Sequence, residues 1–115
     1  MNLTQKHCIP CEGGMPPLSN QEEDKLKVQT PNWILLRNDG QTIVHKIRRQ
    51  FAFKDFKKAI DFVNKIADLA EGEGHHPDIY IFYNKVQLEL FTHAVGGLSE
   101  NDFIMAAKID NLFGK

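Results

Sequence analysis

The sequence predicts an α+β domain, a four-stranded antiparallel sheet with three helices packed on one face. Apolar residues recur at helical spacing over residues 53–70. They alternate with polar residues over 42–51, and two further apolar runs between 78 and 93 flank a turn-like Asn84-Lys85. The resulting element order, αββαββα, is typical of a sheet whose helices are segregated to one side.

The sequence predicts an extended or mobile N-terminal arm over residues 1–17 and a single domain over residues 18–115. The arm holds the only cysteines, Cys8 and Cys11, in a Cys-x-x-Cys spacing. A structural zinc site needs two more ligands, and a redox motif normally lies between a strand and a helix. Three interpretations stay open for the pair: an inert tail, adventitious metal binding and a labile disulfide.

The domain begins with a capping box at 19–22, which predicts a short helix that Thr30-Pro31 ends. Strand composition follows at 33–37, and residues 38–40 (Asn-Asp-Gly) predict a turn into the second strand. A second capping box at 99–102 opens the last helix.

The helix predicted over 53–70 is apolar on two sides, with Gly72 and Gly74 as left-handed stops after it. One row at helical spacing consists of Phe53, Phe56, Ile60, Val63, Ala67 and Ala70. A second row consists of Ala59, Phe62, Ile66 and Leu69. Since one sheet contact needs only one row, we expect the second to bind a partner, most simply in a homodimer or homotetramer.

The second hairpin predicts a cluster of histidines. With Asn84-Lys85 as a two-residue turn, counting outward places His76 opposite His93. Opposed residues of antiparallel strands have Cβ atoms roughly 4.5–5.5 Å apart. His75 would then lie beside the pair, so three of the five histidines gather at one end of the hairpin.

Imidazole gives and accepts protons near neutral pH, so His75, His76 and His93 are candidates for proton transfer. Zinc is the competing use of three histidines. Adjacent residues on a strand point to opposite faces, which disfavours a metal shared by His75 and His76. His45 is expected to be an outward or rim residue of its strand.

A longer spaced pattern runs through this region, made of Glu71, His75, His76, Pro77, Tyr83, His93 and Asp102. Together with Phe-x-Phe-Lys-Asp-Phe at 51–56, it resembles the signature of the pterin-4a-carbinolamine dehydratases. The resemblance covers nearly the whole chain from residue 33 onward and leaves out the arm with its two cysteines.

The resemblance implies a hydro-lyase that converts 4a-hydroxytetrahydrobiopterin to quinonoid dihydrobiopterin and water, within tetrahydrobiopterin recycling. It implies no metal and no cofactor, and assembly into dimers or tetramers. Carried over by position, the catalytic residues are His75, His76 and His93, with His75 or His93 favoured as the acid. Carried over in the same way, the residues that bind or orient the pterin are Glu71, Pro77, Asp102 and Trp33.

Two alternatives remain. In animals the family also includes a dimerisation cofactor of a homeodomain transcription factor, so the chain could be a protein-binding module that uses the second row of the helix. It could also keep the fold and act elsewhere in pterin or molybdenum-cofactor metabolism.

Composition excludes several other classes. The formal net charge of −1 argues against a nucleic-acid binder that works by bulk electrostatics. No apolar run approaches the ~20 residues that cross a bilayer. The N-terminus resembles neither a secretory signal nor a transit peptide, so we expect a cytoplasmic protein.

Overall fold

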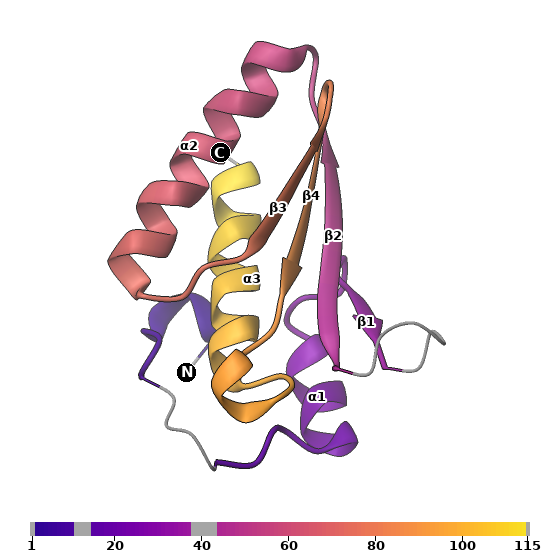
Figure 1. The fold of residues 1–115 in the computed structure, drawn as a ribbon, viewed down its shortest axis with the longest axis vertical. Coiled ribbons are helices and arrows are strands. Elements are labelled where there is room, and N and C mark those ends of the chain that lie inside the picture. Colours follow the sequence, from indigo (N-terminus) through magenta and orange to yellow (C-terminus); the bar gives the residue numbers. More distant parts are fainter. Residues whose placement is uncertain (1, 11–14, 38–43, 115) are drawn as a thin grey trace.

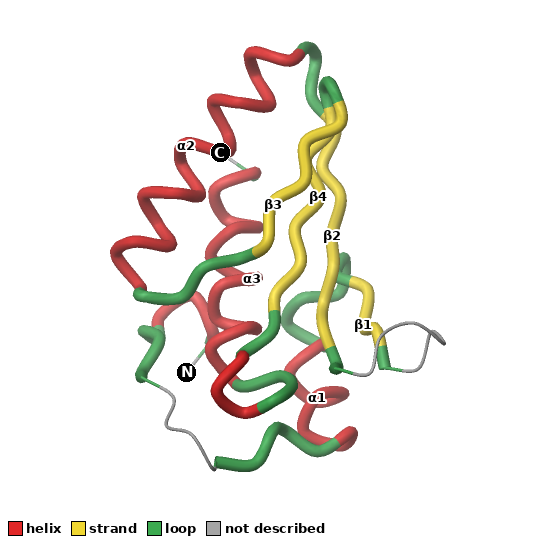
Figure 2. The backbone as a smooth tube through the Cα atoms, viewed as in Figure 1, coloured by secondary structure: helices red, strands yellow, loops and turns green. Residues whose placement is uncertain are grey.

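A computed structural model describes residues 2–10, 15–37 and 44–114. It confirms the α+β class and the order αββαββα (Figure 1, Figure 2). The elements are η1 (Leu3–Gln5), α1 (Asn20–Lys27), β1 (Ile34–Leu36), β2 (Lys46–Ala52), α2 (Phe56–Glu73), β3 (Asp78–Phe82), β4 (Lys85–Leu90), η2 (His93–Val95) and α3 (Glu100–Phe113). The turn predicted at 38–40 and Cys11 lie outside the described residues. In the described part of the chain, no helix has the length and apolar character needed to span a membrane.

All strand pairs in the sheet are antiparallel, and the spatial order is β1-β2-β4-β3. Helices α2 and α3 lie on one face, and α1 packs near the start of α3 (Figure 1). Alternate residues of a strand share a face, and in the two central strands one such set is buried beneath the helices. Its members are Ile47, Phe51, Val86, Leu88 and Leu90.

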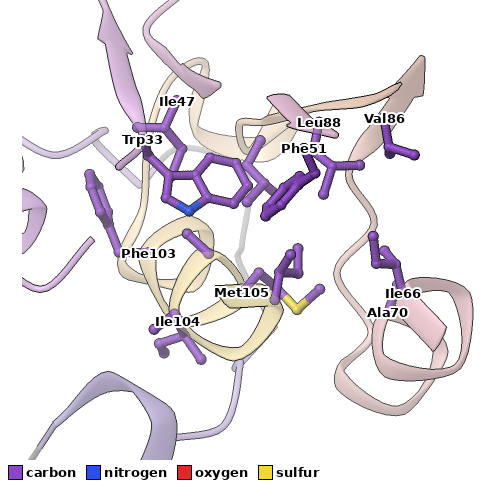
Figure 3. Close-up of a cluster of buried hydrophobic side chains, with 14 of the residues drawn as sticks. Trp33, Ile47, Phe51, Ile66, Ala70, Val86, Leu88, Phe103, Ile104 and Met105 are labelled. Atoms are coloured by element: carbon purple, nitrogen blue, oxygen red, sulfur yellow. The ribbon is translucent and has the colours of Figure 1, made fainter. Parts of the chain in front are cut away.

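Aromatic side chains fill the space between the sheet and α3 (Figure 3). Trp33 is 1% exposed and lies edge-on to Phe51, with 6.3 Å between ring centroids. Its indole N–H donates to Asp110 Oδ1 at 2.8 Å, which satisfies the one polar group of a buried indole.

The predicted roles of the two rows on α2 need correction. The helix begins at Phe56, where the Asp55 side chain accepts from the Lys58 N–H at 2.8 Å. Its buried residues are Ala59, Phe62, Ile66 and Ala70. Three of these belong to the row assigned to a partner, and Leu69 of that row packs against the core. The assignment is wrong because this row packs inside the chain itself.

A matched pair of substitutions tests which face of α2 is the core. Ile66→Ala removes a side chain that is fully buried, and we expect it to lower the free energy of unfolding by about 2–5 kcal/mol. Ile60→Ala, on the other row, is expected to cost about 1 kcal/mol or less. Chemical denaturation of both variants measures the difference, and equal costs would contradict the assignment.

Candidate active site

The end of α2 positions the two adjacent histidines. Gly74 ends the helix in the left-handed conformation, with φ 68°, which glycine adopts without strain. The N–H groups of Gly74 and His75 both donate to the Ala70 carbonyl, at 2.9 and 3.3 Å. His76 and Pro77 then lead into β3, so both imidazoles lie where the chain passes from α2 to the sheet.

His75 is paired with a buried carboxylate. Its Nε2 lies 2.6 Å from Asp102 Oδ1, and the two side chains are 12% and 0% exposed. Asp102 Oδ2 accepts from the Thr92 hydroxyl at 2.8 Å and from the Ser99 N–H at 2.9 Å. An ionised carboxylate only accepts, so Nε2 of His75 carries the proton of this bond. The other ring nitrogen, Nδ1, is then the one that can exchange a proton with a ligand.

Asp102 also connects this pair to the segment that carries His93. Thr92 precedes His93 directly, and its backbone pairs with Gly97 through a 2.8 Å hydrogen bond. His93 opens η2, and its ring lies 4.3 Å from the ring of Phe91, centroid to centroid. One carboxylate therefore ties the end of α2, the end of β4 and the first turn of α3 together.

His76 forms a second histidine–carboxylate pair, with Nε2 2.6 Å from Glu71 Oε2. The two side chains are 59% and 78% exposed. Because water screens exposed pairs, this contact holds its ring less firmly than Asp102 holds His75.

The predicted pairing of His76 with His93 is wrong. The hairpin turn occupies residues 83–84, one position earlier than expected, because Asn84 forms two hydrogen bonds with the backbone of Phe53, at 2.8 and 3.0 Å. His93 lies beyond the end of β4, in η2, so no strand ladder opposes it to His76. Instead, Asp102 connects the two segments, because it is bonded both to His75 and to Thr92, which directly precedes His93.

The remaining predicted residues divide into two groups. Pro77 and Glu71 belong to the segment around the histidines, as expected. Trp33 does not, because it lies in the core and is only 1% exposed, so within this chain its ring has no exposed face on which a ligand could stack. Thr92 was not among the predicted site residues. A threonine before a histidine gives no signal in the sequence, and its part becomes visible only in the hydrogen bond from its hydroxyl to Asp102.

Known proteins resemble this chain over nearly its whole length. The sequence model of the family "Pterin 4 alpha carbinolamine dehydratase" matches residues 16–112. A Nitrosospira multiformis protein provisionally named a pterin-4-alpha-carbinolamine dehydratase is 52% identical over 112 residues, 97% of this chain and 93% of its own. A Methylococcus capsulatus protein with the same provisional name is 50% identical over 111 residues, 96% of this chain and 93% of its own.

Solved structures extend the likeness to three dimensions. The transcriptional coactivator/pterin dehydratase from Brucella melitensis superposes with a TM-score of 0.75 at 31% identity, over 84% of this chain and 97% of that one. A pterin dehydratase-like protein identified as a RuBisCO assembly factor in the alpha-carboxysome has a TM-score of 0.59 at 25% identity, over 73% of this chain and 92% of that one. The match of the family model over most of the chain, together with these relatives, shows that the chain belongs to the pterin-4a-carbinolamine dehydratase family.

Proposed function

We propose that the chain removes water from a 4a-hydroxytetrahydropterin by histidine acid–base catalysis. The observation that carries this proposal is the hydrogen bond between His75 Nε2 and the fully buried Asp102 Oδ1, at 2.6 Å. A buried carboxylate that holds one ring nitrogen leaves the other oriented and available, which is what a proton-transfer catalyst requires. Family membership supplies the substrate class.

The reaction needs two proton transfers. The bond between C4a and the hydroxyl oxygen breaks as an acid protonates that oxygen, and water leaves. A base takes the proton from a ring nitrogen, and the electron pair forms the double bond of the quinonoid dihydropterin. Each positioned transfer contributes typically 10²–10⁴-fold to the rate.

The roles of the histidines follow from their partners. We assign the acid to His75 in its imidazolium form, which keeps Nε2–H on the Asp102 carboxylate and gives the Nδ1 proton to the leaving oxygen. His93 and His76 are the candidate bases, with Glu71 orienting His76. Pro77 would limit the movement of the segment after the two adjacent histidines. The finer assignment, to 4a-hydroxytetrahydrobiopterin in cytoplasmic cofactor recycling, belongs to this proposal.

A direct rate assay tests the function. Purified protein added to a chemically prepared 4a-hydroxytetrahydropterin should accelerate its loss of water, and a rate equal to that of buffer would refute the proposal. Among residues 2–10, 15–37 and 44–114, no group of three or more His, Cys, Asp or Glu side chains is arranged to hold a metal. We therefore expect a chelator to leave the rate unchanged, and inactivation by chelator would restore the zinc interpretation.

We also propose that the chain associates with copies of itself, through β3 rather than through the buried row of α2. This strand lies at the sheet edge, and every one of its residues is exposed. Ile79, Tyr80, Ile81 and Phe82 are 36%, 41%, 40% and 53% exposed. An unpaired apolar edge strand is a ready template for another strand. The row expected to bind a transcription-factor helix is buried, so no observation on α2 favours the protein-binding alternative.

Sedimentation of one pair of variants tests self-association. The wild-type chain should sediment as a species larger than one chain, and Tyr80→Lys should shift it toward the monomer by placing a charge in the strand–strand contact. Val28→Lys alters a side chain that is 77% exposed beside α1, so it should keep the wild-type value. A monomeric wild-type chain, or equal behaviour of the two variants, would contradict association through β3.

A further inference from the structure

The N-terminal arm is docked against the domain near the end of α2 and the start of α3 (Figure 1). Leu3, in η1, is 1% exposed in the core, and its N–H donates to Gln29 Oε1 at 3.0 Å. Lys6 pairs with Glu100, in the first turn of α3, at 2.8 Å. Arm residues 2–10 therefore have defined contacts, where the sequence predicts an extended or mobile segment.

The arm's first link to the site is Glu73, the last residue of α2 and two residues before His75. Glu73 Oε1 accepts from the Cys8 N–H at 2.8 Å, and Oε2 accepts from Lys108 at 2.7 Å. Burial opposes ionisation of Glu73, but the hydrogen bonds from Lys108, Cys8 and His7 outweigh it and lower the pKa to about 2. Glu73 is therefore ionised at neutral pH and attaches the arm to the end of α2.

The second link is Asn101, in the first turn of α3 and directly before Asp102. Its side chain, 4% exposed, forms two hydrogen bonds with the backbone of Ile9: it accepts from the N–H at 3.0 Å and donates to the carbonyl at 2.6 Å. Because both polar atoms of the amide are used, this contact fixes the direction of the arm as well as its distance from α3.

Cys8 adds a third contact, from its thiol. Its Sγ lies 3.7 Å from the Asn101 carbonyl oxygen, to which the S–H donates. Burial, followed by the negative charge of Glu73, raises the pKa of this thiol from 9.0 to about 12. The thiol therefore stays protonated near neutral pH and can act as a donor, a role that none of the three interpretations of the cysteine pair anticipates.

We propose that Cys8 and Ile9 form a positioning element for the His75–Asp102 pair. These two neighbouring arm residues are bonded to Glu73 and to Asn101, and each of those lies within two residues of one member of the pair. The arm thereby holds the end of α2 against the start of α3. The inference rests on the proposed function of the pair, and it extends the machinery to a segment that the family model, which begins at residue 16, does not cover.

The magnitude of the effect follows from the geometry of the pair. A hydrogen bond of 2.6 Å tolerates little movement, and displacement of a catalytic group by about 1 Å can cost 10²-fold in rate. Without the arm contacts, the end of α2 remains joined to α3 by the Glu73–Lys108 ion pair and the His75–Asp102 bond. The arm adds Cys8 and Ile9 as a further connection to the first turn of α3, where Asp102 lies. We therefore expect loss of the arm contacts to lower kcat more than it raises KM.

Asn101→Ala tests the proposal, because it removes both hydrogen bonds to Ile9 and leaves His75 and Asp102 intact. The expected result is a fall in kcat of about tenfold to 10²-fold with KM nearly unchanged. Asn111→Ala is the matched control: it changes the same residue type at the exposed far end of α3 and should keep wild-type kcat. Thermal unfolding sets an assay temperature at which every variant is folded.

Nitrogen-15 NMR of the histidine rings gives a readout that does not depend on turnover. The wild-type chain should show the Nε2–H form of His75 with a slowly exchanging proton, and Asn101→Ala should show faster exchange and a mixture of tautomers. If Asn101→Ala does not fold, Asn101→Leu, which is close to asparagine in size and also loses both hydrogen bonds to Ile9, takes its place in both measurements.

The outcomes separate this inference from the proposed function. An active wild-type chain whose folded Asn101 variant keeps both kcat and the His75 signal would overturn the positioning role and leave the dehydratase function standing. A wild-type chain without dehydratase activity, in which Asn101→Ala still releases the His75 proton, would overturn the function and keep the positioning role.

Discussion

Replacing His75 by alanine is expected to lower the dehydration rate constant kcat about 10²–10⁴-fold, the usual contribution of one positioned acid or base. Two described histidines are bonded to a fully buried carboxylate, and His75 is the less exposed of the two, at 12% against 30% for His45. The substitution removes the proton donor and leaves the backbone of the segment unchanged. The effect is measured by stopped-flow absorbance, which monitors the loss of water from a chemically prepared 4a-hydroxytetrahydropterin.

A histidine elsewhere in the fold provides the control. His45 Nδ1 contacts Glu23 Oε2 at 2.9 Å, near α1. His45→Gln keeps a donor for that carboxylate, so we expect kcat close to the wild-type value. If His75→Ala were as active as His45→Gln, the acid would have to be another residue.

Asp102→Asn is expected to be nearly as damaging, on the order of 10²–10⁴-fold in kcat, although it changes the shape of the side chain very little. If the amide oxygen stays with the Thr92 hydroxyl and the Ser99 N–H, the amide NH₂ faces His75. That group donates, so Nε2 of His75 has to accept, and the ring can no longer carry a proton on both nitrogens as the acid requires. The imidazolium form also loses its negative partner. The decrease should appear in kcat rather than in KM.

Glu71→Gln makes the same chemical change in the exposed pair with His76. Because Glu71 is 78% exposed and its pair is screened by water, we expect a loss of less than about tenfold. A larger loss for Glu71→Gln than for Asp102→Asn would reverse the order of importance that we assign to the two pairs.

Local signals in the sequence predicted most of the fold. The first capping box has its expected bonds, since the Glu22 N–H donates to Ser19 Oγ and the Ser19 N–H to Glu22 Oε1. The second is represented by the bond from the Ser99 N–H to Asp102. Such caps depend on residues three positions apart, so they can be read from the chain alone.

The assignment of the faces of α2 could not be read in this way. Both rows of the helix are apolar, and periodicity shows that a face is apolar without showing what covers it. Ile66 and Phe62 turn toward the core because of how the whole helix lies against α3 and the sheet. The exposed position of Phe56, at 49%, is a consequence of the same packing.

The residues of the candidate site stay a prediction, but part of their expected geometry was wrong. The hairpin count that joined His76 to His93 failed because the turn lies one residue earlier. Asn84 is held by Phe53, from the end of β2, and such a contact between distant segments leaves no local signal. The bond between Asp102 and His75 was also not predicted, because capping of α3 already explains an acid at this position.

The most direct test of the candidate site is a titration of the protein, labelled with carbon-13 in its histidine rings, with a 7,8-dihydropterin that lacks the 4a-hydroxyl. The ring signals of His75, His76 and His93 should show saturable shifts, while that of His45 stays in place. Shifts confined to other histidines, or three unmoved rings at saturating pterin, would contradict this prediction.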